Sequence, residues 1–425
     1  MAAAVELAAR GIPVTVFESA RQPGGRARGV LYQDTQLDNG QHLLLGCYHD
    51  TLRLIEKVGG NIERDFLRLP LQLDLHNHLV LRAPHLPAPL HLLAALLRAD
   101  GLSSAERWRA MRFMLALRLQ RFYLTQDTSV SALLAQYRQP PALISKLWEP
   151  LCIAALNTPI AQASAQVLLN VLRDAFNRRR ADSDMLLPRI DFTQLFPQRA
   201  IEFVRQHHGK VQLTCRVDAL RHTPEGIALH AGENVQTFTH VICATSPTAA
   251  AKLLHTLPKL AGVAAKIDAL QMQPIYTVYL QYPPKIALPH AMIGLHQSMS
   301  QWLFDKGKIS GQAGLIASVI SAEGAHQQLT HDELAMNVTA ELREQFGLRD
   351  CPIWHQVIAE KRATFCCAPN LDRPGQSTPL PGIFLAGDYT AGDYPATLEG
   401  AVRSGVKCAQ EILLHSSDKP CHQQG

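Results

Sequence analysis

The stretch Gly382-Ile383-Phe384-Leu385-Ala386-Gly387-Asp388, with the residues that follow it as far as Gly405, decides the fold. It predicts a short apolar strand that stops at a glycine and an acid, then a loop, and then a helix whose small residues allow close approach. A glycine at a strand end lets backbone N–H groups face a phosphate, and the acid after it accepts from a sugar hydroxyl. The start of the helix adds a favourable field for negative charge. The stretch therefore predicts dinucleotide binding, near the C-terminal end of the chain.

The beginning of the chain supplies the other half of the predicted site. Residues 1–9 are strong helix formers, Gly11 ends the helix, and the strand Val14-Thr15-Val16-Phe17-Glu18 follows. In a dinucleotide-binding fold, an acid at the tip of the second strand binds the adenosine ribose, and Glu18 has that position. Because the helix begins at the first residue, we expect the first strand and its glycine-rich turn to be missing.

Two turns after this strand are further candidates for cofactor contact. Arg21-Gln22-Pro23-Gly24-Gly25-Arg26-Ala27-Arg28 is a glycine pair flanked by arginines. Its guanidinium groups would clamp a pyrophosphate through bidentate hydrogen bonds, and the alternative interpretation is a basic, solvated turn. Asp38-Asn39-Gly40-Gln41-His42 is typical of a turn at which backbone approaches a flat ring. A lone histidine is usually structural, so His42 alone indicates little.

In this order, the motifs resemble the FAD-dependent flavin amine oxidase and phytoene desaturase superfamily. The residue sequences of these motifs are most similar to those of its squalene-associated branch, the hydroxysqualene dehydroxylases of hopanoid and squalene synthesis. The resemblance covers essentially the whole chain, including Leu187-Pro188-Arg189 before a capped helix and Glu360-Lys361-Arg362-Ala363-Thr364-Phe365 before the final motif. The final motif is specific, and the others are moderately so.

The resemblance implies FAD as cofactor and a role for each motif toward it. The implied contacts are Glu18 at the adenosine ribose, Gly24, Gly25 and Arg26 at the pyrophosphate, Gln41 and His42 at the isoalloxazine, Val217 at the adenine, and Gly387 and Asp388 at the pyrophosphate and ribitol. Thr397 and Leu398, at the start of the last helix, would direct N–H groups at the pyrimidine edge of the flavin, where negative charge gathers on reduction.

The resemblance also implies a reaction on an apolar triterpene. Reduced flavin would deliver a hydride to an allylic carbon of hydroxysqualene as water leaves, which gives squalene; the sequence leaves the electron donor open. Departure of the hydroxyl needs a proton donor or water. Asp393, Tyr394 and His42 all belong to the motifs that are expected to surround the flavin. Asp393 and Tyr394 are also common loop-shaping residues, so no catalytic residue is assigned. No metal is expected.

Two alternatives stay open at this point. A carotenoid or phytoene desaturase would run the opposite redox direction, with oxidised FAD accepting a hydride from a polyene precursor. A protein of another class, an N-terminally truncated, FAD-free remnant that acts as a lipid-binding or scaffold protein, would also explain the expected loss of the first strand.

The expected fold class is α/β with two domains, because 425 residues exceed the ~250–300 that one core usually holds. A Rossmann-like FAD-binding domain would be assembled from residues 1–70, 195–250 and 355–415. A mixed α+β substrate domain would be formed by residues 71–194 and 251–354. Residues 416–425 are expected to be a disordered tail.

Composition indicates a soluble protein of the cytoplasm. Apolar residues make up 47% and charged residues 18% of the chain, no signal peptide is recognisable, and nine scattered cysteines indicate reduced thiols. The formal charge of +5 permits attraction to an anionic membrane surface and does not indicate nucleic-acid binding. The capping box Ser103-x-x-Glu106 predicts a long helix to Tyr123. That helix is interpreted either as a core helix with snorkelling arginines or as a peripheral membrane contact or tunnel mouth.

Overall fold

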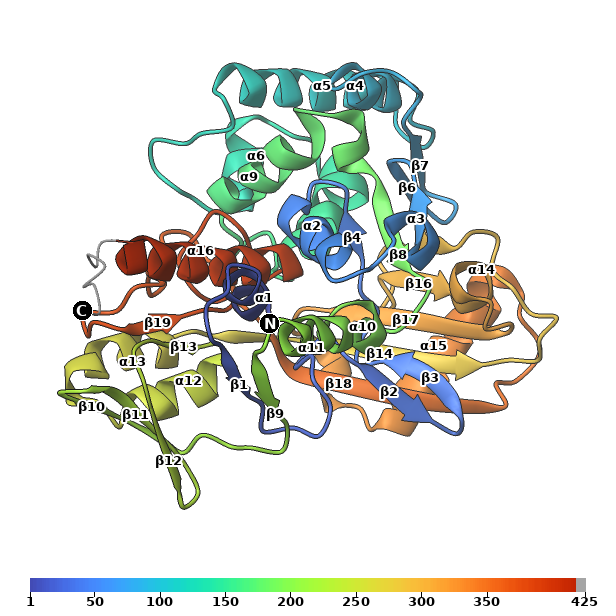
Figure 1. The fold of residues 1–425 in the computed structure, drawn as a ribbon. Coiled ribbons are helices and arrows are strands. Elements are labelled where there is room, and N and C mark those ends of the chain that lie inside the picture. Colours follow the sequence, from blue (N-terminus) through green and yellow to red (C-terminus); the bar gives the residue numbers. More distant parts are fainter. Residues whose placement is uncertain (418–425) are drawn as a thin grey trace.

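The computed structural model describes residues 1–417 (Figure 1). Of the predicted tail, residues 416 and 417 end helix α16 (Leu398–Ser417), and residues 418–425 lie outside the described residues. The N-terminal segment and the C-terminal helix lie together, as the sequence predicts, because α1 (Ala2–Ala8) packs along α16. A Cβ at Gly405 would lie 3.2 Å from the Ala2 Cβ, so the small residues of α16 make room for α1.

Two pairs of parallel strands join the segments that were expected to form the cofactor domain. β1 (Thr15–Phe17) pairs with β9 (Lys210–Gln212), and β13 (Val241–Cys243) pairs with β19 (Ile383–Leu385). Each pair therefore links parts of the chain that are far apart in sequence, as in a discontinuous α/β domain. The expectation that a strand and a glycine-rich turn are missing before Met1 is not confirmed and stays a prediction.

The largest sheet combines both insertions. Its order is β18 (Trp354–Phe365), β14 (Met272–Gln281), β17 (Leu315–Ser321), β16 (Trp302–Asp305), β15 (Met292–Gly294), β6 (Gln72–Leu75) and β7 (Leu79–Arg82). α15 (His331–Phe346) packs on it through Leu334, Val338 and Leu342, and these residues form one apolar cluster with β14, β16 and β17. The domain boundaries stay a prediction; β18, from the segment 355–415, lies within this sheet, so the two expected domains share it.

Helices of the first insertion stand above this sheet in Figure 1. They are α4 (Leu90–Leu97), α5 (Ser104–Leu119), α6 (Val130–Gln136), α7 (Pro141–Leu143), α8 (Glu149–Leu156) and α9 (Ala165–Phe176). The capping box predicted at Ser103 is present: its side chain accepts from Glu106 N, and the Glu106 carboxylate accepts from Ser103 N at 2.7 Å. The helix ends at Leu119, four residues earlier than predicted, because Arg121 and Phe122 adopt positive φ.

The remaining elements connect these layers. In the N-terminal part they are β2 (Gly29–Tyr32), β3 (Thr35–Asp38), β4 (Leu44–Leu45), α2 (His49–Lys57), α3 (Ile62–Asp65), β5 (Phe66–Leu69) and β8 (Met185–Pro188). Further along they are α10 (Phe192–Leu195), α11 (Pro197–Gln206), β10 (Ala219–Thr223), β11 (Gly226–Ala231), β12 (Asn234–Phe238), α12 (Pro247–Leu254), α13 (Ala261–Asp268) and α14 (Lys306–Ser310). The Asp191 side chain caps α10, the helix predicted after Arg189.

Candidate functional site

Two predicted site residues from opposite ends of the chain form an ion pair. Arg26 Nη2 lies 2.7 Å from Asp388 Oδ1, and Arg26 Nη1 donates to the Ala363 carbonyl. The Asp388 side chain is 8% exposed, and a carboxylate this buried needs a cationic partner. The ion pair therefore joins the turn after β1 to the turn after β19, and the Arg26 guanidinium, 32% exposed, stays accessible from solvent.

Gly387 has a geometry that only glycine tolerates. Its φ is +156°, and an added Cβ would lie 2.4 Å from Cε1 of the Tyr389 ring. Its N–H donates to Ser404 Oγ in α16 at 2.8 Å, which fixes the turn against that helix. The glycine at the strand end therefore lets the chain pass close to a buried aromatic ring and places Asp388 at the carboxyl end of β19.

The residues predicted at the adenosine end gather at the carboxyl ends of β1 and β9. Glu18 N donates to Gln212 O at 2.9 Å, and Cys215 N donates to Glu18 O at 2.8 Å. The Glu18 carboxylate accepts from Ala20 N at 2.8 Å. Val217 follows in the segment before β10 and is partly buried against the main core.

The amino group of Met1 lies near this end of the site. Burial lowers its pKa, and the Glu18 charge raises it in part. Gly24 and Gly25, in the turn before Arg26, have φ of +118° and +58°, a backbone that favours glycine. The Met1 amino group therefore lies close enough to Glu18 to feel its charge, and the contacts of Glu18, Gly24 and Gly25 with a cofactor stay a prediction.

A buried polar cluster surrounds the turn at Gly40. Lys306, the first residue of α14, is 5% exposed, and its Nζ lies 3.4 Å from Gln41 Oε1. Asp38 is 5% exposed, and its Oδ1 accepts from Phe192 N at 2.9 Å. Among the described residues Lys306 forms no ion pair within 4.0 Å, so a buried ammonium faces this turn without a carboxylate in direct contact.

The low polarity around this cluster shifts the pKa of each titratable member. Burial raises the pKa of Asp38 to about 6, and the hydrogen bond from Phe192 and the Lys306 charge oppose that rise. Burial lowers the pKa of His42 to about 4, so its ring is neutral at pH 7. Burial also lowers the pKa of Lys306, against the opposing effect of Asp38. Together, these groups can accept or release a proton, with Asp38 and Lys306 buried and His42 partly buried.

Several buried polar atoms near the predicted site have no hydrogen-bond partner in the described part of the chain. They are His42 Nδ1, Thr277 Oγ1 and the hydroxyl of Tyr389. A Cβ at Gly40 would lie 3.6 Å from Thr277 Oγ1, so Thr277 of β14 lies against the turn that contains His42. Buried polar groups are nearly always satisfied, and these atoms therefore fit a polar ligand lying beside the turn.

The first turn of α16 is held in place by its own residues. Thr397 Oγ1 accepts from Gly400 N at 3.1 Å, and Leu398 begins the helix. Glu399 is fully buried; its Oε2 accepts from Thr51 N and its Oε1 from Arg403 Nε. This network fixes the start of α16, where Thr397 and Leu398 were predicted to meet the flavin.

Asp393 and Tyr394, two of the three residues considered as proton donors, have different surroundings. Tyr394 is buried, and its hydroxyl donates to Asp174 Oδ2 at 2.8 Å. Asp393 is exposed, and its carbonyl accepts from Asn170 Nδ2 at 3.1 Å. Both residues thus act in holding the loop. Sequence reasoning missed Lys306; its signal was a lysine that follows Asp305 directly after the apolar residues Trp302-Leu303-Phe304.

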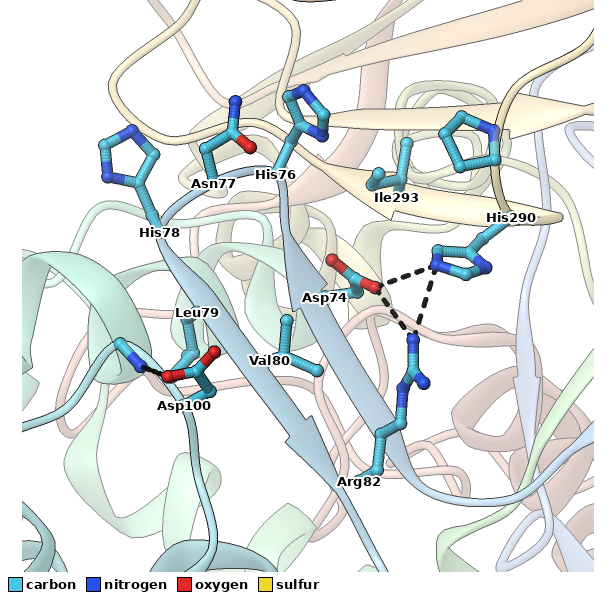
Figure 2. Close-up of a pocket in the computed structure, with 12 residues that line it drawn as sticks. Asp74, His76, Asn77, His78, Leu79, Val80, Arg82, Asp100, His290 and Ile293 are labelled. Atoms are coloured by element: carbon cyan, nitrogen blue, oxygen red, sulfur yellow. Dashed lines mark hydrogen bonds and ion pairs between the residues drawn. The ribbon is translucent and has the colours of Figure 1, made fainter.

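A separate cavity of about 490 Å³ lies at the β6–β7 hairpin (Figure 2). Asp74, Arg82 and His290 meet at its edge, with Asp74 Oδ2 3.4 Å from Arg82 Nη2 and 3.3 Å from His290 Nε2. None of the predicted cofactor residues lines it, and polar and apolar atoms contribute about equally to its lining. The cavity therefore lies apart from the candidate cofactor site.

The sequence of this chain is similar over nearly its full length to several known proteins. A hydroxysqualene dehydroxylase from Rhodopseudomonas palustris is 29% identical over 97% of this chain and 96% of its own length. One from Zymomonas mobilis is 25% identical over 98% of this chain and 97% of its own length. A zeta-carotene desaturase from Synechocystis is 23% identical over 98% of this chain and 96% of its own length.

The fold and the family are shown by two further matches. The solved structure of an oxidoreductase from Methanosarcina mazei has a TM-score of 0.73 at 16% identity and covers 96% of this chain and 97% of that chain. The model of the family described as flavin containing amine oxidoreductase matches residues 1–413. The chain therefore belongs to the flavin containing amine oxidoreductase family and is an FAD-dependent oxidoreductase.

Proposed function

We propose that this protein reduces hydroxysqualene to squalene with reduced FAD as the hydride source. The observation that carries the proposal is similarity over nearly the full length to three hydroxysqualene dehydroxylases, at 25–29% identity. Burial of Asp38 and Lys306 at the turn of Gly40 supports it, because removing a hydroxyl from an apolar substrate needs a proton donor shielded from bulk water.

The residues present fit FAD. Arg26 and the turn at Gly387 would hold the pyrophosphate, Glu18 the adenosine ribose, and the start of α16 the pyrimidine edge. The unpartnered His42 Nδ1 and Thr277 Oγ1 would face polar atoms of the ring system. When bound, FAD supplies a hydride to a carbon atom of the substrate.

Lys306 is our choice for the proton donor. Its ammonium is buried beside Gln41, and burial lowers its pKa, which makes proton release easier than from an exposed lysine. In the reaction the C–O bond of the substrate breaks and the oxygen leaves as water with the Lys306 proton. The carbon would gain a hydride, which is the two-electron reduction that bound, reduced FAD would supply. Asp38, whose charge raises the pKa of Lys306, is the acid that would restore its proton.

The experiment compares two classes of substrate, a triterpene alcohol and carotenoid precursors, and two lysines. Protein reconstituted with FAD is reduced by light in the absence of oxygen and given hydroxysqualene. In a second reaction, the oxidised protein is given phytoene or zeta-carotene. Mass spectrometry of the extracted lipid should show squalene from the first and no new polyene from the others. Lys306→Met should lower turnover by about a hundredfold or more, whereas Lys308→Met, an exposed lysine in the same helix, should not.

A desaturase is the second candidate, because zeta-carotene desaturases also match nearly the whole chain. Conversion of a carotene alone would establish that candidate and refute the first. Squalene production that is equal in the Lys306→Met variant and in the wild type would leave the reaction standing and refute the assigned proton donor.

A further inference from the structure

Exposed apolar side chains concentrate on one surface of the molecule. Leu90, Leu97, Trp108, Leu115, Leu119 and Tyr123, here called the α4–α5 face, are 47–77% exposed. They make up half of the twelve large apolar side chains that are exposed in the described part of the chain, within only 34 residues. α4 and α5 lie side by side along the top edge of the molecule in Figure 1. An apolar cluster of this kind marks an interaction surface rather than scattered exposure.

Helix α5 is apolar on two opposite sides. Ala110, Phe113 and Leu117 point into the core. Trp108, Leu115 and Leu119 are spaced by seven and four residues, so they form a single stripe on the opposite side. The core explains the first set alone, and the interpretation of α5 as a core helix therefore covers only half of its apolar surface.

Arginines accompany the outward stripe. Residues 86–123 contain six arginines and only two acids, Asp100 and Glu106. Arg107 and Arg109 donate to carbonyls of the protein, Leu97 O at 3.2 Å and Arg138 O at 2.8 Å. Arg112 and Arg118 are exposed, and no side-chain hydrogen bond or ion pair of theirs is found among residues 1–417. This surface is thus positive and apolar at once, which is complementary to anionic lipid headgroups over acyl chains.

We propose that the α4–α5 face binds the surface of an anionic lipid bilayer. Trp108, Leu115 and Leu119 enter the headgroup region, and Arg112 and Arg118 contact lipid phosphates. In the described part of the chain no helix is long and apolar enough to cross a membrane, so α4 and α5 would lie on the bilayer surface. The proposal goes beyond the proposed reaction and does not depend on it.

Flotation of the full chain with lipid vesicles tests the binding. Vesicles of phosphatidylcholine alone are compared with vesicles that also contain phosphatidylglycerol, at low and at high salt. We expect strong binding to the anionic vesicles, weaker binding to the neutral ones, and partial release by salt. Brominated acyl chains should quench the emission of Trp108, and Trp108→Phe should bind while losing that quenching.

Matched variants distinguish lipid binding by the α4–α5 face from nonspecific adsorption of the protein to vesicles. Trp108→Ser/Leu115→Ser/Leu119→Ser should lower partitioning into anionic vesicles by about tenfold or more. Leu31→Ser/Met336→Ser, which removes equally exposed apolar side chains elsewhere, should not. Arg112→Gln/Arg118→Gln should weaken binding to anionic vesicles only. Arg221→Gln, at an exposed arginine of β10, is the control for this double variant. Circular dichroism establishes that each variant is folded.

Three outcomes would overturn the proposal. The first is a wild type that stays unbound with both kinds of vesicle, and the second is a triple variant that floats as well as the wild type. The third outcome is a dimer in gel filtration that the triple variant converts to a monomer, because the face would then be covered by a second copy of this chain.

Discussion

Arg26 and Asp388 lie 362 positions apart in the chain, and Arg26 Nη2 approaches Asp388 Oδ1 to 2.7 Å. Through this ion pair the turn after the first strand and the turn after the last strand share one electrostatic environment. The pair is only partly shielded on the arginine side, so a phosphate can reach the guanidinium without displacing Asp388 from the protein interior.

Removal of the Arg26 charge should weaken FAD binding. Arg26→Gln loses charge-assisted hydrogen bonds, and we expect the dissociation constant for FAD to rise by about tenfold to a hundredfold. Fluorescence titration of the cofactor-free protein measures this change. Arg21→Gln is the matched control, because Arg21 is an exposed arginine of the same turn. Equal affinities for the two variants would contradict a cofactor role for Arg26.

Gly387→Ala should destabilise the fold. The new Cβ would lie 2.4 Å from the buried Tyr389 ring, and the backbone φ of +156° is unfavourable for alanine. We expect a loss of about 1–3 kcal/mol in the free energy of unfolding, or more, by denaturant titration. Gly392→Ala, in the same loop with open space around it, should change that free energy by less than about 0.5 kcal/mol. If Gly387→Ala proves as stable as Gly392→Ala, the described packing of Tyr389 is wrong.

Burial of His42 predicts a specific pH dependence. The pKa of its ring is about 4 in the fold and about 6.5 when unfolded, so the unfolded chain binds more protons between these values. The His42 contribution is complete above pH 6.5, and up to about 3 kcal/mol is lost as the pH falls to 4. Asp38, whose pKa is raised to about 6, acts in the opposite direction over about pH 4–6.

Comparison of variants isolates the histidine from Asp38. Unfolding of the wild type and of His42→Gln should be measured between pH 4 and 7, with the exposed His222→Gln as control. The stability of His42→Gln relative to the wild type should improve as the pH falls, and that of His222→Gln should stay constant. A constant difference for both variants would show that His42 titrates normally in the fold.

The Glu399 carboxylate should be needed for the start of α16. It is fully buried and accepts from Asp50 N, Thr51 N, Thr51 Oγ1 and Arg403 Nε. Its removal in Glu399→Ala leaves several buried donors unpaired, and we expect a loss of about 3–5 kcal/mol. Thermal and urea unfolding measure it, with Glu411→Ala in the same helix as control. A cost below about 1 kcal/mol would argue against this network.

Features set by local rules could be predicted from the sequence. The capping box at Ser103, the strand just before Gly387 and the helix that follows depend on neighbouring residues, and all are present. The pairing of Lys306 with Gln41 could not be predicted, since it depends on how β16 pairs with β17 in a sheet built from two insertions. The joining of β6 to β15 likewise depends on a single parallel bridge between Leu75 and Gly294.

The outward side of α5 shows the same limit in another way. The sequence showed leucines and arginines together, and it left a core helix and a membrane contact as alternatives. Only the fold shows that Phe113 is buried while Trp108 and Leu119 are exposed. One helix therefore serves the core on one side and presents an unpartnered surface on the other.

The most direct test of the proposed reaction is an anaerobic single turnover in D₂O. Protein with photoreduced FAD is mixed with hydroxysqualene, flavin absorbance is followed, and the lipid is analysed by mass. We expect reoxidation of the flavin and one squalene formed per flavin. That squalene should carry one deuterium, because the transferred hydrogen exchanges with solvent before transfer. Flavin that stays reduced beside unchanged hydroxysqualene would contradict the account.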